Sequence, residues 1–217
     1  LERDYRLFRG KTKQYIFISS ASAYQKPPAS YLMNESTPLH NPYWEYSRNK
    51  ARCEARLMEL YREEGFPATI VRPSHTYDER HVPCGIHGAH GYSYPVLERM
   101  RAQKRVIIHG DGTSLWAMTH ARDFAIGFVG LMGNIHAIGE AVQITTDEVV
   151  TWNQIFEITA DALGVTLHAV HVPSEVLAKA GKQYDYEGGL LGDKAHSKVF
   201  DNSKIKRLVP GFVATTR

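Results

Sequence analysis

Short apolar runs alternate with a long amphipathic stretch in the first third of the chain. Tyr15–Ser19 reads YIFIS, a β-branched and aromatic run that is typical of a strand buried on both faces of a parallel sheet. A helical pattern opens at Asn41-Pro42, continues to about residue 64 and ends at Gly65. Ala68–Val71 (ATIV) then forms a second strand pattern. Strand, helix and strand in this order predict a βαβ unit whose two strands are parallel.

The remaining two thirds carry weaker signals that still predict alternating helices and strands. Helices are expected at about Tyr94–Gln103, Ala121–Leu131 and Trp152–Leu163, and strands at Arg105–His109, Ala141–Ile144 and Val165–Val172. Thr151 and Gly164 suit the two ends of the last of these helices, as N-cap and C-terminal glycine. The last forty residues or so are polar and poorly periodic, and predict no element. The pattern as a whole indicates an α/β protein.

Composition places the chain among ordinary soluble globular proteins. Of its 217 residues, 43% are hydrophobic and 23% charged, so one sizeable core with a smaller lobe is expected. The net charge of +3 permits an anionic ligand, and no run of five or six basic residues indicates a nucleic-acid patch. The apolar runs are too short to span a bilayer. With two cysteines and a charged N-terminal segment, we expect a cytoplasmic protein.

The sequence WEYSRNKARCEARL places Tyr46 four residues before Lys50 on the expected helix. This spacing stacks two side chains on one helix face, close enough to act together. The same pair also occurs by chance on solvated helices, so it needs corroboration from elsewhere in the chain. Ser19-Ser20 ends the first strand and Arg72-Pro73 ends the second. Ligands of open α/β sheets bind at this carboxyl edge.

Several further motifs follow in an order that resembles the extended short-chain dehydrogenase/reductases, the NAD-dependent epimerase/dehydratases. The matching segments are Ser19, Ser20 and Tyr24 after the first strand, Tyr46 and Lys50, Arg72-Pro73-Ser74-His75-Thr76-Tyr77, Gly110-Asp111-Gly112, Asp123 and the helix Thr151–Leu163. The resemblance runs through nearly the whole chain and is more specific than the Tyr46/Lys50 pair alone.

The resemblance implies an NAD- or NADP-dependent site with named residues. It implies catalytic roles for Ser20, Tyr46 and Lys50; cofactor contacts from Ser19, Tyr46, Lys50, Pro73 and His75; and substrate contacts from Ser20, Ser22, His75 and Trp116. Tyr46 would be the acid/base, Lys50 its electrostatic partner and a ligand of the nicotinamide ribose, and Ser20 the group that orients the substrate oxygen.

Physical chemistry supports these roles. Hydride transfer to or from a carbon that bears oxygen requires a proton to move on that oxygen. A free tyrosine is a weak base at neutral pH because its pKa is about 10. An ammonium group one helical turn away favours the phenolate.

Purely structural roles for some of these residues remain open beside the functional ones. Ser19 and Ser20 could be turn residues at a strand end. Tyr24 suits packing better than chemistry, and Arg72 suits a structural ion pair as well as a ligand contact.

The glycine-rich dinucleotide fingerprint of the family is absent, because no GxGxxG or GxxGxxG follows a strand. The first strand corresponds to the family's fourth, and the chain stops at GFVATTR, before the family's final helix. We therefore expect a chain that lacks the N-terminal cofactor-binding half and the extreme C-terminus, binds a dinucleotide weakly and is inactive alone. Tyr15–Ser19 would then be an exposed apolar sheet edge.

On this view the chain has two parts. Residues 1–77 form the C-terminal part of a Rossmann-type doubly wound parallel sheet. Residues 78–217 form a smaller mixed α/β substrate-binding lobe, from which about 121–146 returns to the sheet.

Two departures bear on the substrate. Ala21 and Ser22 stand where the family's dehydratases carry an Asp-Glu pair, which disfavours water elimination. His75 and Trp116 stand near the Asn and Arg that grip a nucleotide diphosphate, and an indole does not replace a guanidinium fork. A nucleotide-sugar substrate is therefore in doubt, and a smaller or differently charged one is open.

The loop HVPCGIHGAHG contains His81, Cys84, His87 and His90, whose side-chain types bind zinc or nickel. The spacing matches no metal motif, so polar loop or substrate contacts are favoured and no metal site is expected.

The leading hypothesis is an NAD(P)-dependent oxidoreductase or epimerase acting on a sugar-like hydroxyl or ketone. The alternative is a non-catalytic or RNA-binding protein on the same fold, since atypical relatives share THARDF (Thr119–Phe124) and Trp116 would offer an exposed aromatic surface. The Ser20, Tyr46 and Lys50 set favours the enzyme, and nucleic acid is not an expected partner. The resemblance also suggests a homodimer formed through the Tyr46/Lys50 helix.

Overall fold

A computed structural model describes residues 1–86 and 93–214 of the chain. Its helices are α1 (Glu2–Phe8), α2 (Glu45–Glu64), α3 (Tyr94–Arg101), α4 (Ala121–Leu131), α5 (Trp152–Leu163), α6 (Ser174–Ala180), the π-helix η5 (Glu187–Lys194) and α7 (Ser203–Leu208). Its strands are β1 (Tyr15–Ile18), β2 (Leu32–Met33), β3 (Ala68–Pro73), β4 (His75–Tyr77), β5 (Val106–His109), β6 (Leu115–Trp116), β7 (Met118–His120), β8 (Ala141–Ile144), β9 (Val150–Thr151), β10 (Ala169–Val172) and β11 (Val199–Phe200). Short 3-10 turns lie at Ala21–Ala23, Ile135–Ala137 and Lys182–Tyr184.

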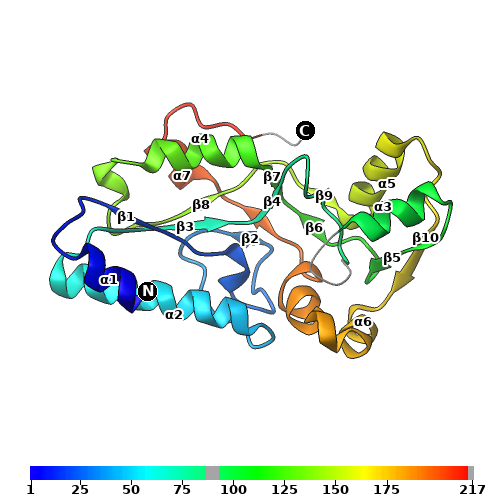
Figure 1. Cartoon of the computed structure of the whole chain (residues 1–217), viewed down its shortest axis with the longest axis horizontal. Helices are drawn as coiled ribbons and strands as arrows, with labels where there is room; N and C mark the ends of the chain where they lie inside the picture. Colours follow the sequence, from blue (N-terminus) through cyan, green and yellow to red (C-terminus); the bar gives the residue numbers. More distant parts are fainter. Residues whose placement is uncertain (87–92, 215–217) are drawn as a thin grey trace.

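A parallel sheet in the order β1-β3-β8 forms one end of the elongated molecule (Figure 1). Tyr15 pairs with Ala68, and Ile70 pairs with Ala141. The parallel pairing of β1 and β3 across α2 confirms the predicted βαβ unit. β8 returns the chain to this sheet after α4, which is the segment expected to do so.

Alternate residues of β3 face helices on opposite sides of the sheet. Ala68 and Ile70 pack with Leu57 and Leu60 of α2. Val71 faces the other way, into a cluster with α4 and α7. That second cluster consists of Val71, Leu131, Ala137, Val142, Ile144, Ile205, Phe212 and Ala214. Figure 1 shows α2 and α4 on opposite sides of the sheet, so the sheet is doubly wound.

β1 lies at an edge of this sheet and pairs only with β3 among the described strands. It is half-buried, and Ile18 is 39% exposed. The prediction of a strand buried on both faces is therefore wrong, and the prediction of an exposed apolar edge is confirmed. The reason is that nothing in residues 1–86 and 93–214 pairs with the outer side of β1.

α2 begins three residues later than the sequence pattern predicted. Trp44 is its N-cap, and Asn41 lies in the loop before it. The Asn41 Oδ1 accepts backbone N–H groups of Tyr43 and Trp44, both at 3.1 Å. Its Nδ2 donates to the Ser22 carbonyl at 2.9 Å and to the Gly192 carbonyl at 2.7 Å. Asn41 therefore joins three chain segments instead of opening the helix.

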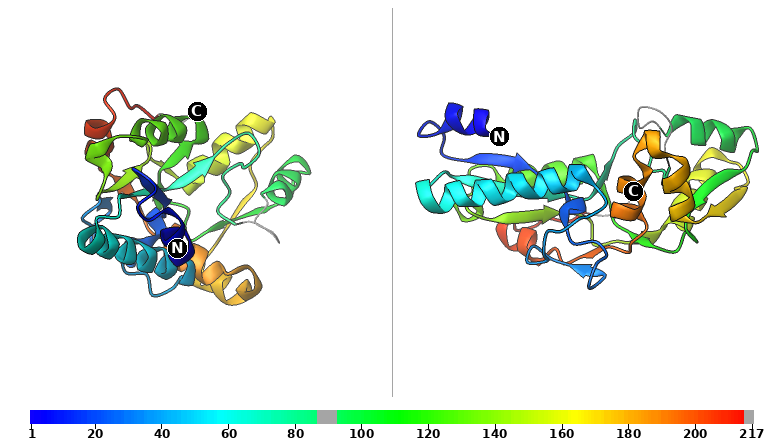
Figure 2. Two further views of the ribbon diagram at one scale, coloured as in Figure 1. Left: turned by 60° about the vertical axis from the view of Figure 1, so that its left-hand side comes forward. Right: turned by 90° about the horizontal axis from the view of Figure 1, so that it is seen from below.

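The second group of elements surrounds the parallel pair β5 and β10 at the other end of the molecule (Figure 2). α3 and α5 pack here around Trp116 and Trp152. α5 has the predicted ends, with Thr151 and Gln154 forming a capping box and Gly164 in the left-handed conformation. β10 starts at Ala169, later than expected. No element was predicted for β4, β6, β7 or β9.

The C-terminal segment packs against the β1-β3-β8 sheet, to which α4 and β8 bring the chain back earlier. The sequence did not predict this second return of the chain to the sheet. β11 pairs in parallel with β2, and α7 packs on β8. Ile205 is fully buried there, beside Phe212. No helix in the described part of the chain is long and apolar enough to cross a membrane.

Replacing Ile205 with alanine tests this second return. We expect the free energy of unfolding to fall by about 3 kcal/mol, because the change removes a fully buried side chain from a packed cluster. Val129, which is 60% exposed on α4, is the control, and its replacement by alanine should cost less than about 0.5 kcal/mol. Urea titration followed by circular dichroism measures both. Equal decreases in the free energy of unfolding for the Ile205 and Val129 variants would show that α7 is not part of the core.

Candidate active site

A cavity of about 330 Å³ lies beyond the carboxyl ends of β1 and β3. Its lining residues are Ser20, Ser22, Trp44, Tyr46, Pro73, Ser74, His75, Thr76, Trp116, Asp193, Lys194 and Lys198. The cavity therefore brings together six of the eight residues predicted for the site. The two others, Ser19 and Lys50, lie next to it along the chain and along α2.

Lys50 is fixed between the end of β1 and the Tyr46 ring. Its Nζ donates a hydrogen bond to the Ile18 carbonyl at 2.7 Å and lies 5.5 Å from the centroid of the Tyr46 ring. Tyr46 is 44% exposed, with its ring 5.0 Å from that of Trp44. The ammonium group thus stands one helical turn from a phenol that is open to the cavity, as the four-residue spacing predicted.

Three hydroxyl groups form a chain that ends at Ser20. Ser47, which is fully buried on α2, donates to Ser22 Oγ at 2.8 Å. Ser22 Oγ lies 2.8 Å from Ser20 Oγ, and the Ser22 backbone N–H donates to Ser20 Oγ at 3.1 Å. If Ser22 donates its proton to Ser20, the Ser20 proton is left for a group in the cavity. Ser47 is a contributor that the sequence analysis missed, although it follows Tyr46 directly.

Replacing Ser22 with alanine tests this hydroxyl chain. We expect kcat to fall about tenfold, because Ser20 loses a hydrogen-bond partner that orients its proton. Ser30, whose hydroxyl accepts only an exposed backbone N–H, is the control, and its replacement by alanine should leave kcat unchanged. Steady-state kinetics of both variants decide the point, and an unchanged kcat in the Ser22 variant would contradict it.

Ser19 points away from the cavity into a buried ionic cluster. Its hydroxyl donates to the Glu54 carboxylate, which also pairs with Arg72 at 2.6 Å. Glu54 and Arg72 are 3% and 5% exposed, so Arg72 is a structural ion-pair partner in this structure. The structure thus places the Ser19 side chain against α2 and not among the cavity residues.

Tyr24 belongs to the same buried surroundings. Its hydroxyl donates to Gln143 Oε1 at 2.8 Å, and the Arg72 guanidinium lies 4.9 Å from its ring centroid. Burial raises the pKa of Tyr24 above its ordinary value. Its role in this structure is packing.

His75 and Trp116 contact each other inside the cavity wall. The Trp116 Nε1 donates to His75 Nδ1 at 3.2 Å, and the two rings meet edge to face. Trp116 is only 1% exposed, because Trp152 packs on it and Lys198 Nζ lies 3.8 Å from its ring centroid. The prediction that Trp116 would be an exposed aromatic is therefore wrong.

Asp193, Lys194 and Lys198 supply a charged wall that the sequence analysis missed. They come from the end of η5 and the segment that follows it. Lys198 Nζ pairs with Asp193 Oδ1 at 2.6 Å. Lys26 is buried nearby, and its Nζ donates to the Tyr24 carbonyl at 3.3 Å. These residues lie in the polar C-terminal segment for which the sequence predicted no element, and the ion pair with Asp193 allows Lys198 to be buried.

Burial and mutual repulsion act together on these charges. Burial, followed by the charge of Lys198, lowers the pKa of Lys26 to about 8. Burial also lowers the pKa values of Lys194 and Lys198. Burial opposes ionisation of Asp193, but the charges of Lys198 and Lys26 hold the pKa of its carboxyl below the ordinary value. The wall therefore combines one carboxylate with three lysines whose ammonium forms are all disfavoured by burial.

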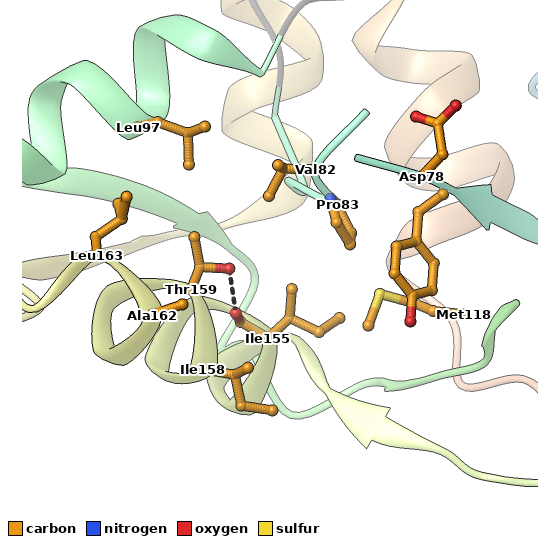
Figure 3. A pocket seen from close by; sticks show the side chains of 11 residues that line it. Asp78, Val82, Pro83, Leu97, Met118, Ile155, Ile158, Thr159, Ala162 and Leu163 are labelled. Carbon is orange, nitrogen blue, oxygen red and sulfur yellow. Dashed lines mark hydrogen bonds between the residues drawn. The ribbon is translucent and has the colours of Figure 1, made fainter. Parts of the chain in front are cut away.

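A second pocket, of about 270 Å³, is apolar (Figure 3). It lies between α3, α5 and the segment around Val82 and Pro83, and Leu97, Ile155 and Leu163 line it. Its polar side chains are Tyr77, Asp78 and Thr159, and the Thr159 hydroxyl donates to the Ile155 carbonyl at 2.7 Å. Lysine is absent from the described residues that line it, so they contain no pair comparable to Tyr46 and Lys50.

The predicted His- and Cys-rich loop is described only in part. His81 is exposed and bonds to Asp78, with Nδ1 and Oδ1 2.9 Å apart. Cys84 is buried, and burial raises the pKa of its thiol to about 12. His87 and His90 lie outside the described residues. Within 1–86 and 93–214, no three His, Cys, Asp or Glu residues are grouped as metal ligands.

The doubly wound parallel sheet and the cavity at its carboxyl edge define a Rossmann-like α/β protein. The sequence profile of the NAD dependent epimerase/dehydratase family matches residues 6–145, and the chain belongs to this family. The resemblance inferred from the motifs is thereby confirmed at the level of the family.

Curated relatives agree with this assignment. The chain is 23% identical to 2'-dehydrokanamycin reductase of Streptomyces kanamyceticus over 197 residues, which cover 91% of this chain and 54% of that protein. It is 27% identical over 158 residues to the chloroplast stem-loop binding protein of 41 kDa b of Arabidopsis thaliana, covering 71% and 37% of the two chains. The chain thus spans about half the length of the curated relatives or less.

Solved structures share the fold over nearly the whole chain. The epimerase Mth375 of Methanothermobacter thermautotrophicus superimposes with a TM-score of 0.77 at 15% identity, covering 100% of this chain and 58% of that one. UDP-glucuronic acid 4-epimerase of Bacillus cereus, in complex with UDP-glucuronic acid and NAD, gives a TM-score of 0.74 at 21% identity, covering 95% and 58%.

Proposed function

We propose that this protein is an NAD(P)-dependent oxidoreductase or epimerase that acts on a sugar-like hydroxyl or ketone. The observation that carries the proposal is the cavity in which Ser20 and Tyr46 meet, with the Lys50 ammonium 5.5 Å from the Tyr46 ring. The family supports a dinucleotide-dependent reaction, and relatives that bind or act on sugars support the substrate class.

The chain's residues suit the reactive end of a nicotinamide dinucleotide. The Lys50 ammonium bonds to one backbone carbonyl and keeps two N–H donors, which is the donor set that a ribose diol requires. Pro73 and His75 line the same cavity as Tyr46. No glycine-rich fingerprint for the pyrophosphate occurs in the sequence. Tyr46, Lys50, Pro73 and His75 would therefore hold the nicotinamide end.

When bound, the dinucleotide would accept or supply the hydride at the substrate carbon. Tyr46 would move the proton on the substrate oxygen, and Lys50 would stabilise the phenolate form of that side chain. Ser20 would donate a hydrogen bond to the same oxygen and fix it against Tyr46. The Ser47–Ser22–Ser20 chain would set the direction of that hydrogen bond.

Water elimination is not part of the proposed reaction. Ala21 is fully buried, and the Ser22 hydroxyl is engaged by two other serines, so the two positions after Ser20 offer no acid/base pair. We therefore place the protein with the oxidoreductases or epimerases of the family and not with its dehydratases.

RNA binding is the second candidate, and one relative, the Arabidopsis stem-loop binding protein, favours it. The exposed aromatic surface on which it depended is absent at Trp116, which is buried. A binding module also has no need of Tyr46 and Lys50 together at a cavity.

Dinucleotide titration of the full-length protein separates the two candidates. We expect calorimetry to show saturable binding of NAD or NADP, and Lys50→Met to weaken it about tenfold or more, because a charged hydrogen-bond donor is lost. The matched control is Lys11→Met, since Lys11 is exposed and lies outside the cavity. Salt-sensitive RNA binding with no dinucleotide binding would overturn the proposal.

A further inference from the structure

Trp44 places an indole ring beside the proposed acid/base at the start of α2. It lines the cavity, and its ring centroid lies 5.0 Å from that of Tyr46, with 44° between the ring planes. Side chains two residues apart on a helix do not face each other. Trp44 is the N-cap and has an extended backbone (φ −124°, ψ 114°), so its ring is not bound by the helical spacing and meets that of Tyr46.

Few contacts locate the Tyr46 ring on the surface of α2. Tyr46 is 44% exposed, and in residues 1–86 and 93–214 its hydroxyl makes no hydrogen bond. Its aromatic and cation contacts in the same ranges are with the Trp44 ring and with the Lys50 ammonium, at 5.5 Å. A half-exposed side chain without such neighbours populates several rotamers. The position of the phenol therefore depends on whether Trp44 is itself fixed.

The indole of Trp44 is held by the C-terminal segment. Trp44 Nε1 donates to Asp185 Oδ2 at 2.8 Å, across 141 residues of sequence. The Asp185 backbone is left-handed, with φ 53°, and its N–H bonds to the Lys182 carbonyl at 3.2 Å at the end of a 3-10 turn. The acceptor for the indole therefore belongs to a hydrogen-bonded turn.

The π-helix η5 packs its backbone directly on Trp44 at two glycines. A Cβ at Gly188 would lie 2.2 Å from Trp44 Cδ1, and one at Gly192 would lie 3.0 Å from Trp44 Cβ. The Asn41 side chain also joins the Gly192 carbonyl to the Trp44 N–H, at 2.7 Å and 3.1 Å. The backbone and the indole of Trp44 are therefore both tied to residues 185–192, which lie beside the start of α2 (Figure 1).

We propose that Trp44 is a positioning residue for Tyr46, and that residues 185–192 fix the acid/base through the indole of Trp44. The proposal deepens the function proposed above and rests on it. Catalysis is steeply sensitive to geometry, and a displacement of about 1 Å costs about a hundredfold in rate. The segment that follows α6 therefore controls a reaction at the start of α2, although Asp185 is not among the described residues that line the cavity.

Two other roles for Trp44 predict different kinetics. If the indole only stabilised the loop before α2, its loss would lower the free energy of unfolding and leave kcat of the folded protein unchanged. If the indole only contacted the substrate, its loss would raise KM. A positioning role appears in kcat instead, and it also responds to a change at Asp185, outside the described lining of the cavity.

Asp185→Gly tests the proposal, because it removes the acceptor of the indole and allows the left-handed backbone without strain. We expect kcat to fall about tenfold with little change in KM, since the Tyr46 ring gains rotamer freedom. Asp185→Asn keeps an acceptor oxygen and suits the same backbone, so it should recover most of the lost rate. Gln103→Gly is the matched control, because Gln103 is also exposed with φ 53°, and it should keep full activity.

Nuclear magnetic resonance gives a readout that does not depend on turnover. The ring current of Trp44 shifts the ring signal of Tyr46, which is identified by its absence in Tyr46→Phe. In Asp185→Gly this signal should move toward the position of an unstructured tyrosine, whereas in Gln103→Gly it should stay in place. An unchanged Tyr46 signal in Asp185→Gly, or an unchanged kcat in that variant, would overturn the proposal.

The positioning proposal and the proposed function fail in different ways. A Tyr46→Phe protein with full turnover would overturn both. If turnover depends on Tyr46 but Asp185→Gly leaves kcat unchanged, the chemistry stands and the positioning proposal is wrong. Should Asp185→Gly not fold, Trp44→Phe removes the donor of the same hydrogen bond and is judged by the same change in kcat.

Discussion

Replacing Tyr46 with phenylalanine is expected to lower kcat by about a thousandfold, because the proton on the substrate oxygen loses its donor and acceptor. The ring remains, so its contact with Trp44, at 5.0 Å between centroids, should persist. Lys50 keeps its bond to the Ile18 carbonyl, and dinucleotide affinity should change less than about threefold. Steady-state kinetics and calorimetry on the full-length protein measure the two effects.

Tyr61 is the matched control, since it lies on the same helix, packs on Gly139 and does not line the cavity. Tyr61→Phe should leave kcat unchanged. A Tyr46→Phe protein that retains more than about a tenth of the activity would show that another group moves the proton.

Replacing Arg72 with methionine is expected to lower the free energy of unfolding by about 4 kcal/mol. Arg72 Nε and Nη2 bond to the Glu54 carboxylate at 2.6 to 3.1 Å, and Nη1 donates to the Glu35 carbonyl at 3.0 Å. Without Arg72, the Glu54 carboxyl group is left buried, with the Ser19 hydroxyl as its remaining hydrogen-bond partner among the described residues. The loss would loosen α2 from the ends of β1 and β3, where the site is assembled.

Arg122 is the matched control, because it also forms an ion pair with a glutamate but lies on the surface. It pairs with Glu79 at 3.0 Å, but both side chains are about 70% exposed. Arg122→Met should cost less than about 1 kcal/mol in urea titration, because an exposed ion pair is screened by water. Comparable decreases in the free energy of unfolding for Arg72→Met and Arg122→Met would mean that the ion pair of Arg72 with Glu54 does not hold the site together.

The sequence was most informative where local signals and tertiary packing agree. The uninterrupted apolar run of β1, the long helical pattern of α2 and the apolar run of β3 predicted the βαβ unit and its parallel pairing. The resemblance to the family pointed to Tyr46, Ser20 and His75, and the gathering of parallel strand ends at one sheet edge supported Ser20 and the segment after Pro73. The structure places all three residues around the cavity.

The missed features share a physical cause, namely polar side chains that are buried by their partners. Residues 193–198 resemble a solvated segment in the sequence, yet Lys198 is buried by Asp193 and by the Trp116 ring. Glu54 is likewise buried, by its pair with Arg72. Hydropathy patterns do not register such burial, because it depends on a charge or ring supplied by a distant segment. Short strands such as β6 and β9 also carry too few residues for a pattern.

Hydride transfer is the central claim, and isotope labelling tests it most directly. The full-length protein would be mixed with a set of keto sugars and with a reduced dinucleotide that carries deuterium at the transferred position. We predict one carbon-bound deuterium in the sugar product by mass spectrometry, and a labelling rate for Tyr46→Phe that is lower by about a thousandfold. Sugar that contains no deuterium in any mixture, or equal labelling by Tyr46→Phe, would contradict the account.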